Sequence, residues 1–409
     1  MFTRLLEKLF ASYAQFPVIA VLGPRQSGKT TLVQKVFADY GFVSLENPLL
    51  RDFATTDSER FLRTYANEKG LVIDEFQYVP QLLSYIQLDV DASQRKNYYI
   101  LTGSQNFLVN QAITQSLAGR VGILHLQPLS IAELASNGLL PADPAEAVFN
   151  GCYPRLYKDQ FSPVRFYPSY IQTYVERDVR QITKVEDLNS FQKFLQLCAA
   201  RIGSLLNLTD LAAVCGISVS TARRWISLLE ASYLIFLLEP YFNNFNKRLT
   251  KMPKLYFYDT GLACALLRIS SVEALTLHPA WGGLFECFII ADLAKQYCNR
   301  GLRPPLYFWR DRNGRLEVDC LIDEGGRLFP LEIKAGERVS TEFLAGLTEW
   351  NEMAFAPESK EEREAVASST FLVYAGKEKQ LRSQAVVVPW SEAGNLVDQV
   401  THLRASREK

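Results

Sequence analysis

Residues 23–30 read Gly-Pro-Arg-Gln-Ser-Gly-Lys-Thr, which fills every fixed position of the pattern G-x-x-x-x-G-K-[ST]. Glycine at positions 23 and 28 lets backbone N–H groups approach phosphate oxygens that a side chain would keep away. Lys29 supplies a charge for the β- and γ-phosphates, and the Thr30 hydroxyl is placed to ligate Mg²⁺. The pattern therefore predicts a site for ATP and Mg²⁺. The predicted nucleotide-binding residues are Gly23, Gln26, Ser27, Gly28, Lys29, Thr30 and Thr31.

Two further segments carry polar residues that suit the same chemistry. Residues 69–76 form an apolar run that ends in Asp74 and Glu75. In a nucleotide site, Asp74 would hold Mg²⁺ and Glu75 would act as the base toward the attacking water. Residues 97–104 end in Thr-Gly-Ser, so Thr102 or Ser104 would face the γ-phosphate or that water. The alternatives are a strand that ends in solvated acids and an ordinary turn or helix cap.

The flanking residues indicate how these groups are positioned. Residues 16–22 are an apolar run of strand length, and residues 30–37 have helical spacing. The phosphate loop would therefore lead from a strand into the N-terminus of a helix, where the helix dipole favours anions. Because a parallel sheet collects ligand groups at the carboxyl ends of its strands, we expect an α/β fold with the three segments at one edge.

Composition limits the remaining possibilities. The chain has 409 residues, 48% of them hydrophobic and 22% charged, which suits two or three ordered domains. There is no apolar run of membrane-spanning length, and seven scattered cysteines without a C-x-x-C pair indicate reduced thiols. We therefore expect a cytoplasmic protein without a membrane partner. Lysine plus arginine equals aspartate plus glutamate at 44 each, so bulk charge does not indicate nucleic acid binding.

The order of these motifs resembles a known family. After the loop, the Ile-Asp-Glu strand and the Thr-Gly-Ser strand come Leu-Ala-Gly-Arg at 117–120 and Pro-Leu-Ser at 128–130. This succession resembles the compact AAA+-type P-loop ATPases of bacteria and archaea, whose carboxyl-terminal region has a largely unknown function. Residues 151–154, 174–178 and 256–261 agree with that resemblance. It implies ATP hydrolysis and a homo-oligomer.

Arg120 is the candidate arginine finger. Such a residue stabilises transition-state charge and is worth about 10³–10⁵ in rate. The alternative is a structural arginine paired within its own domain, and Arg155 and Arg177 are weaker candidates for the same role. The sequence leaves open whether a finger acts within one subunit or across two.

The middle of the chain has helix-turn-helix spacing. Residues 208–215 and 219–230 are predicted helices, joined by a turn, with Ser218 as the N-cap of the second. Val219, Ala222, Ile226 and Leu229 are expected on its buried face. Residues 233–238 and 255–258 read as the strands of a wing, on either side of a cation-rich segment. The predicted DNA contacts are Arg223, Arg224, Lys247, Arg248, Lys251 and Lys254. The alternative is a winged helix used for protein packing.

The last part of the chain resembles the PD-(D/E)xK nuclease core. A predicted helix at 281–295 carries Glu286, and strands at 314–322 and 327–334 carry Asp319, Glu332 and Lys334. In that core the carboxylates hold Mg²⁺, and the lysine polarises water or phosphate. The proline that precedes the aspartate is replaced by Val318. The alternatives are an inactive nuclease-like platform and acids that merely share a sheet.

Together these observations predict three domains: an AAA+-type ATPase at 1–150, a helical linker with a winged helix at 151–270 and a nuclease-like α/β domain at 271–409. The predicted function is ATP hydrolysis coupled to DNA binding or processing, with nuclease activity left open. The alternative is an ATP-dependent regulatory or signalling switch whose nuclease-like domain only binds a protein partner.

Overall fold

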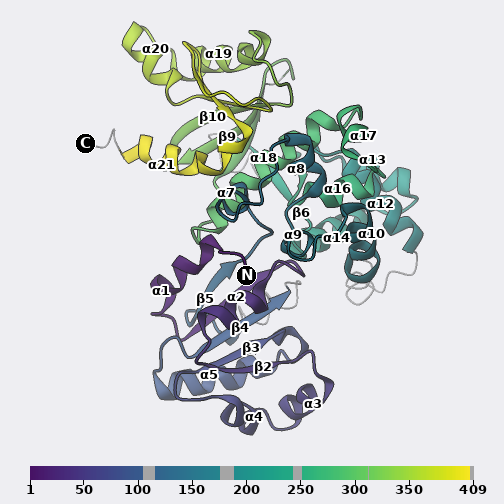
Figure 1. Ribbon diagram of the computed structural model, residues 1–409, viewed down its shortest axis with the longest axis vertical. Helices are drawn as coiled ribbons and strands as arrows, with labels where there is room; N and C mark the ends of the chain where they lie inside the picture. Colours follow the sequence, from purple (N-terminus) through teal and green to yellow (C-terminus); the bar gives the residue numbers. More distant parts are fainter. Residues whose placement is uncertain (105–115, 176–187, 243–250, 312, 406–409) are drawn as a thin grey trace. The chain divides into compact units, whose positions relative to one another are not determined.

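A computed structural model describes residues 1–104, 116–175, 188–242, 251–311 and 313–405 (Figure 1). The chain forms two compact units, and each is considered by itself. Unit 1 consists of Met1–Leu129, Ser227–Leu234 and Cys298–Leu302. Unit 2 consists of Ser130–Ile226, Ile235–Tyr297 and Arg303–Lys409.

Unit 1 is built on a five-stranded parallel sheet with the strand order β2-β3-β4-β1-β5. The strands are β1 (Val18–Gly23), β2 (Gly41–Ser44), β3 (Leu71–Asp74), β4 (Tyr99–Ser104) and β5 (Val121–His125). Because all five strands run in the same direction, the carboxyl ends of β1, β3 and β4, at Gly23, Asp74 and Ser104, lie at one edge of the sheet. The predicted α/β fold with a parallel sheet is confirmed for this unit.

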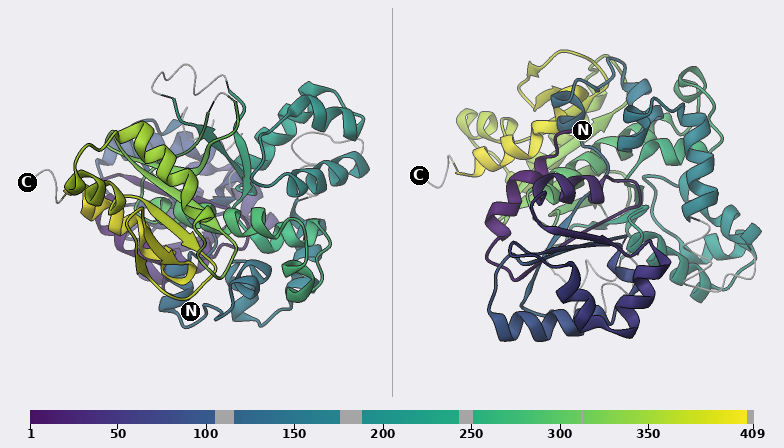
Figure 2. Two further views of the ribbon diagram at one scale, coloured as in Figure 1. Left: turned by 90° about the horizontal axis from the view of Figure 1, so that it is seen from above. Right: turned by 60° about the horizontal axis from the view of Figure 1, so that its bottom comes forward.

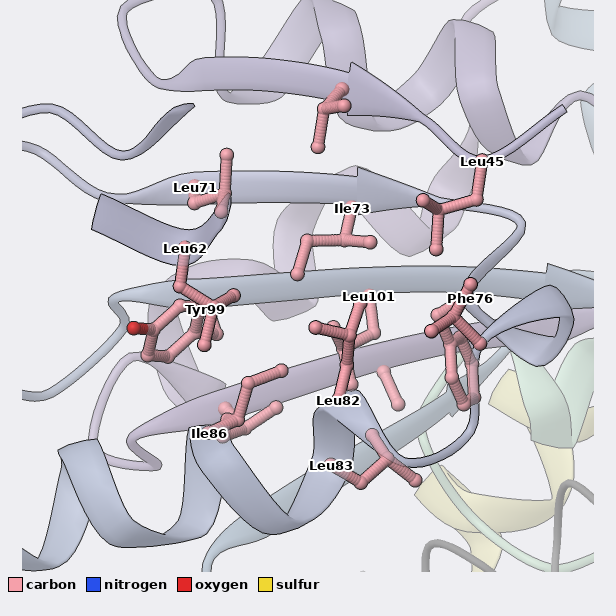
Figure 3. Close-up of a cluster of buried hydrophobic side chains, with 14 of the residues drawn as sticks. Leu45, Leu62, Leu71, Ile73, Phe76, Leu82, Leu83, Ile86, Tyr99 and Leu101 are labelled. Atoms are coloured by element: carbon pink, nitrogen blue, oxygen red, sulfur yellow. The ribbon is translucent and has the colours of Figure 1, made fainter. Parts of the chain in front are cut away.

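Apolar side chains cover both faces of this sheet. Val18, Ala20 and Leu22 of β1 enter one core, whereas the alternating Ile19 and Val21 enter the other. The helices that pack on the first face are α3 (Pro48–Thr56), α4 (Ser58–Tyr65) and α5 (Leu82–Ser93). The second face is covered by η1 (Leu5–Leu9), α1 (Phe10–Tyr13) and α2 (Lys29–Val36). Figure 3 shows the first core, and the right panel of Figure 2 shows the two layers of helices. Both faces being buried explains why these strands read as continuous apolar runs.

Unit 2 begins with helices. They are α7 (Ile131–Ser136), α8 (Pro144–Asn150), α9 (Pro154–Lys158), α10 (Pro163–Tyr170), the π-helix η3 (Ile171–Val175), α12 (Leu188–Ala200), α13 (Leu208–Cys215) and α14 (Val219–Ala231). Asn207 caps α13, which ends at Gly216 with a positive φ of 69°. Both predicted helices of the helix-turn-helix segment are therefore present. The ring of Trp225 lies 5.1 Å from that of Phe191, so α14 packs on α12.

A hairpin follows these helices and joins a larger sheet. Strands β6 (Ile235–Pro240) and β7 (Lys254–Phe257) pair in antiparallel fashion, and β6 also pairs with β8 (Leu306–Arg310). The resulting eight-stranded sheet has the order β12-β13-β11-β10-β9-β8-β6-β7. Its other strands are β9 (Glu317–Glu324), β10 (Arg327–Lys334), β11 (Phe371–Tyr374), β12 (Gln380–Leu381) and β13 (Val386–Pro389). The sheet therefore contains strands from both sides of residue 270, because the end of β6 pairs with β8. The domain boundary expected near that residue stays a prediction.

The remaining helices of unit 2 follow β7 along the chain, and the C-terminal part of the sheet is yellow-green in the left panel of Figure 2. They are α16 (Thr260–Leu266), α17 (Val272–Thr276), α18 (Trp281–Cys298), α19 (Glu342–Phe355), α20 (Lys360–Ala367), η4 (Trp390–Asn395) and α21 (Leu396–Ala405). Trp350 of α19 packs against Val318 of β9 and Leu372 of β11 in one apolar cluster. Helix α18 is predominantly buried, which is why its sequence is apolar on most sides.

Two of the motifs that support the family resemblance meet around one buried carboxylate. Asp259, at the N-cap of α16, accepts hydrogen bonds from Leu262 N (3.0 Å), Cys152 N (2.7 Å) and Tyr167 Oη (2.6 Å). Gly151 has a φ of +68°, and a Cβ atom there would lie 2.0 Å from Tyr167 Oη. Residues 151–154 and 256–261 therefore hold the helices of unit 2 together.

Some expectations about individual side chains differ from the structure. Val219 was expected on the buried face of α14 but is 37% exposed, whereas Ala222 and Ile226 are buried as expected. Val219 is the first residue of the helix. Its side chain therefore lies at the exposed start of α14. All seven cysteines are free and buried. Across the described ranges, no helix is long and apolar enough to cross a membrane.

Candidate functional site

The phosphate-loop pattern occupies the turn between β1 and α2. Gly28, directly before α2, has a φ of +94°, which an L side chain rarely adopts. A Cβ atom on Gly23 would lie 2.1 Å from the Leu126 carbonyl oxygen, so this position also requires glycine. Lys29 is buried, and its Nζ donates to the carbonyl oxygens of Gly23 (3.1 Å) and Pro24 (2.8 Å). The loop therefore surrounds the ammonium group that is expected to meet the phosphates.

The other predicted nucleotide residues lie in the same loop. Gln26 has a positive φ of 64°, which is a strained conformation for a residue other than glycine. The Ser27 hydroxyl is buried, and none of the described residues gives it a hydrogen-bond partner. Thr31 is exposed on the first turn of α2. A nucleotide phosphate is the kind of ligand that such backbone and hydroxyl groups bind at a helix N-terminus.

Asp74 collects hydroxyl groups from three elements. Its Oδ1 accepts from Thr30 Oγ1 at 2.8 Å and from the Thr102 hydroxyl, and its Oδ2 accepts from Ser44 Oγ at 3.0 Å. The Asp74 carboxylate at the end of β3 therefore links β2, β4 and the first turn of α2. A buried carboxylate beside a threonine hydroxyl is a suitable donor set for Mg²⁺ that arrives with nucleotide phosphates. The residues present therefore fit the predicted ion.

Glu75 follows directly and has an unusual backbone. Its φ of 55° is left-handed, and η2 (Phe76–Tyr78) begins after it. The side chain is buried and accepts a hydrogen bond from the Gln77 amide. Burial raises the pKa of Glu75, while the Lys29 charge and the Gln77 hydrogen bond oppose that rise. A carboxylate with a raised pKa is better matched to accepting a proton near neutral pH.

Gln77 was missed by the sequence analysis. Besides contacting Glu75, its Oε1 would lie 2.7 Å from a Cβ atom placed on Gly103. The absence of a side chain at Gly103 therefore leaves room for the Gln77 side chain beside the end of β4. Ser104, the last residue of that strand, has a buried hydroxyl without a hydrogen-bond partner among the described residues. The spacing Glu-x-Gln after an apolar strand is the only sequence signal that could have identified Gln77.

Arg4 is a second residue that sequence reasoning missed. It precedes η1, is only 6% exposed, and donates to the carbonyl oxygens of Ser27 (2.8 Å) and Gln127 (2.6 Å). A Cβ atom on Gly28 would lie 3.9 Å from Arg4 Nη1. The guanidinium therefore braces the phosphate loop against the segment after β5. No local pattern marks this role because the partner atoms are backbone carbonyls far along the chain.

Arg120 lies away from this edge. It precedes β5 and forms an ion pair with Asp91 of α5, with Nε 2.5 Å from Oδ1. Because Val121 pairs with Val18, Arg120 is level with the start of β1, whereas the phosphate loop follows its end. The six residues of β1 separate the two levels, which is roughly 20 Å. Arg120 is therefore not placed to contact a nucleotide held by its own loop. Of the weaker candidates, Arg155 is paired with Asp159 and Arg177 lies outside the described residues.

The predicted DNA contacts have different outcomes. Arg223 and Arg224 are exposed on α14, and Lys251 is exposed before β7. Lys247 and Arg248 lie outside the described residues. The prediction for Lys254 is wrong: this side chain is 3% exposed and is paired with Glu286 and Glu317. Lys254 is the first residue of β7, and its side chain is buried beside the acids of α18 and β9.

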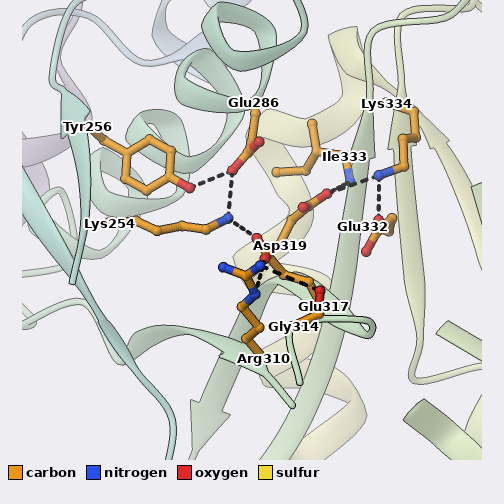
Figure 4. A network of polar contacts seen from close by, with 10 residues as sticks. All are labelled: Lys254, Tyr256, Glu286, Arg310, Gly314, Glu317, Asp319, Glu332, Ile333 and Lys334. Carbon is orange, nitrogen blue, oxygen red and sulfur yellow. Dashed lines mark hydrogen bonds and ion pairs between the residues drawn. The ribbon is translucent and has the colours of Figure 1, made fainter. Parts of the chain in front are cut away.

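The four residues of the nuclease-like pattern lie in the same region of unit 2 (Figure 4). Lys334 Nζ contacts Glu332 and lies 3.5 Å from Asp319 Oδ2, which also accepts from Ile333 N at 2.8 Å. Glu286 instead faces Lys254 and the hydroxyl of Tyr256. Within the described part of the chain, no group of three or more His, Cys, Asp or Glu side chains is arranged to hold a metal ion. The geometry therefore does not support the metal site expected for Glu286, Asp319 and Glu332.

Comparisons with known proteins define the class of the first region. Residues 15–135 match the family described as "AAA domain". Residues 142–273 and 281–393 match two families that are each described as a domain of unknown function, DUF8612 and DUF4143. The parallel sheet, the loop and the matched family identify an AAA-type, P-loop ATPase-like domain. The matches do not test the domain boundaries, which stay a prediction.

The chain also has relatives along most of its length. It is 30% identical over 322 residues to the uncharacterized protein Rv2008c of Mycobacterium tuberculosis and equally to the uncharacterized protein Mb2031c of Mycobacterium bovis. The alignment covers 78% of this chain and 70% of each relative. The chain therefore belongs to the family of these two proteins.

Two solved structures are similar at low identity. The Walker-type ATPase PABY2304 of Pyrococcus abyssi is 15% identical with a TM-score of 0.44, covering 66% of this chain and 96% of that one. The RuvB Holliday junction branch migration motor of Thermotoga maritima is 19% identical with a TM-score of 0.30, covering 57% and 85%. At these values neither likeness indicates a function for this chain.

Proposed function

We propose that this chain binds and hydrolyses ATP with Mg²⁺ and that its nucleotide state controls DNA binding by the middle region. The observation that carries the first half of the proposal is the arrangement at the carboxyl edge of the parallel sheet. There Asp74 contacts the hydroxyl of Thr30, and the neighbouring Glu75 lies buried with a raised pKa. These groups are the ones that the phosphate-loop chemistry requires.

Each residue has a separate role in this proposal. The loop amides and Lys29 bind the phosphates, and Thr30 and Asp74 hold the ion, which supplies positive charge against the phosphate oxygens. Glu75 orients the attacking water and accepts its proton, while Gln77 keeps the Glu75 carboxylate in place. Thr102 fixes the Asp74 carboxylate from the neighbouring strand.

ATP turnover separates these roles experimentally. Lys29→Ala should lose most nucleotide binding, whereas Glu75→Gln should keep binding and lose turnover, because the amide cannot accept the proton. Binding is measured by calorimetry and turnover by phosphate release. Glu59→Gln, which changes an exposed acid of α4, is the matched control and should behave like the wild type. Equal turnover in wild type and Glu75→Gln would exclude Glu75 as the base.

DNA is the proposed partner of the helix-turn-helix segment. Support comes from the order helix, turn, helix and hairpin, and from the exposed cations Arg223, Arg224 and Lys251. An isolated antiparallel bridge between Leu205 and Lys254 also brings the segment before α13 beside β7. Cations on an exposed helix face bind phosphates through a salt-dependent term that every DNA sequence shares.

Replacing the three exposed cations together by alanine should weaken DNA binding across sequences and reduce its salt dependence by about one unit of slope per lost contact. Fluorescence anisotropy with duplex, single-stranded and junction DNA measures this effect. Replacing Lys360, an exposed lysine of α20, is the control. If the wild type binds none of these DNAs at low salt, the segment is a packing module.

The second candidate function is a switch whose nuclease-like domain is an inactive protein-binding platform. One observation favours it over nuclease activity. Glu286, the helical acid of the nuclease-like pattern, contacts Lys254, a lysine that does not belong to the pattern.

A further inference from the structure

Four acidic residues of unit 2 lie close together on three separate elements. Glu286 lies on α18, Glu317 and Asp319 on β9, and Glu332 on β10. Glu317 and Asp319 are two residues apart and therefore project from the same face of β9. Figure 4 shows these side chains around a common polar region. We name them the acid cluster.

A lysine from the hairpin enters this acid cluster. Lys254 Nζ lies 3.5 Å from Glu286 Oε1 and forms an ion pair with Glu317. The ammonium also lies 5.4 Å from the centre of the Phe308 ring. Tyr256, two residues further along β7, donates its hydroxyl to Glu286. Lys254 and Tyr256 thus attach one face of β7 to α18 and β9.

A second lysine satisfies the other half of the acid cluster. Lys334 contacts Glu332 and Asp319, and Asp319 is held further by the backbone N–H of Ile333. Burial and the neighbouring Asp319 raise the pKa of Glu332 to about 8. Its Oε2 is buried without a hydrogen-bond partner among the described residues.

The charges of this region nearly balance without a metal ion. Glu286, Glu317, Asp319 and Glu332 face Lys254, Lys334 and Arg310, the last of which lies 3.4 Å from Glu317. A divalent ion bound by Glu286 would have to replace the buried Lys254 ammonium, and a buried charge that loses its partner is strongly unfavourable.

We infer that Lys254 is a built-in cation that takes the place of a metal ion and makes the acid cluster a metal-free joint. The joint ties the β6–β7 hairpin to α18 and to the rest of the eight-stranded sheet. It explains why Lys254 is buried although Lys251, three residues earlier, is exposed. It also assigns the nuclease-like acids a structural role, independently of whether unit 1 hydrolyses ATP.

Metal stoichiometry on the full chain tests this inference. Mn²⁺ binding, followed by electron paramagnetic resonance with a non-hydrolysable ATP analogue, should give a single ion per chain in the wild type and in Asp319→Asn. If neither protein binds a Mn²⁺ ion, the result counts against the nucleotide site. It agrees with the inference that the acid cluster holds no metal ion. A further ion in the wild type that disappears in Asp319→Asn would overturn the inference, as would Mn²⁺-dependent DNA cleavage that requires Asp319.

Removing the lysine gives the complementary test. Lys254→Met leaves the acids without their cation, so this variant should gain a Mn²⁺ site and a rise in melting temperature on adding Mn²⁺. Both effects should disappear when Asp319→Asn is added. Lys251→Met changes an exposed lysine of the same segment and should resemble the wild type. If Lys254→Met folds and binds no additional Mn²⁺, the acids never formed a potential metal site, and the inference is wrong. If it does not fold, the wild-type and Asp319→Asn stoichiometries decide the question.

Discussion

Replacing Arg4 with alanine should weaken ATP binding although Arg4 lies outside the phosphate-loop pattern. The guanidinium donates to the carbonyl oxygens of Ser27 and Gln127 while being almost completely buried. Hydrogen bonds from a charged donor contribute about 1.5–3 kcal/mol each, so losing both removes about 3–6 kcal/mol from the braced loop. Part of that loss is repaid by solvent where the truncation lets water reach the carbonyls.

The part of this free energy that solvent does not replace should appear as weaker ATP binding. If about 1.4 kcal/mol appears in nucleotide binding, the dissociation constant rises about tenfold, and twice that energy gives about a hundredfold. We expect a rise between these values for Arg4→Ala, measured by calorimetry in the Glu75→Gln background so that ATP is not consumed. The melting temperature of the nucleotide-free protein should fall as well.

The matched control for this prediction is Arg4→Lys. Lysine keeps the charge but lacks the planar fork that reaches two carbonyls at once, so it should recover only part of the affinity. If Arg4→Ala binds ATP like its parent and melts at the same temperature, the contacts with Ser27 and Gln127 do not brace the loop. The same affinity in both variants would mean that the charge is irrelevant and the fork geometry decides.

Three further predictions follow from the same structure. Gln77→Leu should move the acid limb of the ATPase pH profile to higher pH, because Glu75 must be ionised to accept a proton and the Gln77 hydrogen bond lowers its raised pKa. Asp259→Ala should lower the free energy of unfolding by about 3–6 kcal/mol in urea denaturation, since three buried donors lose their acceptor. Mixing Arg120→Ala with Lys29→Ala should restore part of the ATPase activity if Arg120 acts on a neighbouring subunit, as its distance from its own loop requires.

Each of these predictions has a result that contradicts it. An unchanged acid limb in Gln77→Leu would mean that another group titrates. Asp57→Ala, which removes an exposed helix cap, is the control for Asp259 and should cost about 1 kcal/mol, so an equal loss would refute the buried cluster. Inactive mixtures, together with a monomer at all concentrations, would leave Arg120 as a structural partner of Asp91.

The sequence indicated which residues would come together at the candidate nucleotide site, because the patterns that mark them are local. The loop, the strand that ends in Asp74 and the strand that ends in Ser104 each carry their polar residues at a fixed distance from an apolar run. A parallel sheet then brings the strand ends together without any further information. The sequence analysis could not identify Arg4, since its partners are carbonyl groups 23 and 123 residues away.

The C-terminal region shows what could not be predicted from the sequence. The pattern of Glu286, Asp319, Glu332 and Lys334 was visible, and strands and helix formed as predicted. Its surroundings were not visible, because Lys254 belongs to a segment whose other cations suggested an exposed surface. Lys254 is buried beside Glu286 and Glu317, and contacts between residues so far apart in the sequence are not encoded in a local motif.

The affinity for DNA in two nucleotide states tests the central claim most directly. Glu75→Gln holds ATP without turnover, so its DNA affinity with ATP can be compared with that of the same protein with ADP, by anisotropy at low salt with duplex and junction DNA. The account predicts that the two affinities differ at least several-fold and that Lys29→Ala shows a single affinity whichever nucleotide is added. Equal affinities in both nucleotide states of Glu75→Gln would contradict the coupling of ATP hydrolysis to DNA binding.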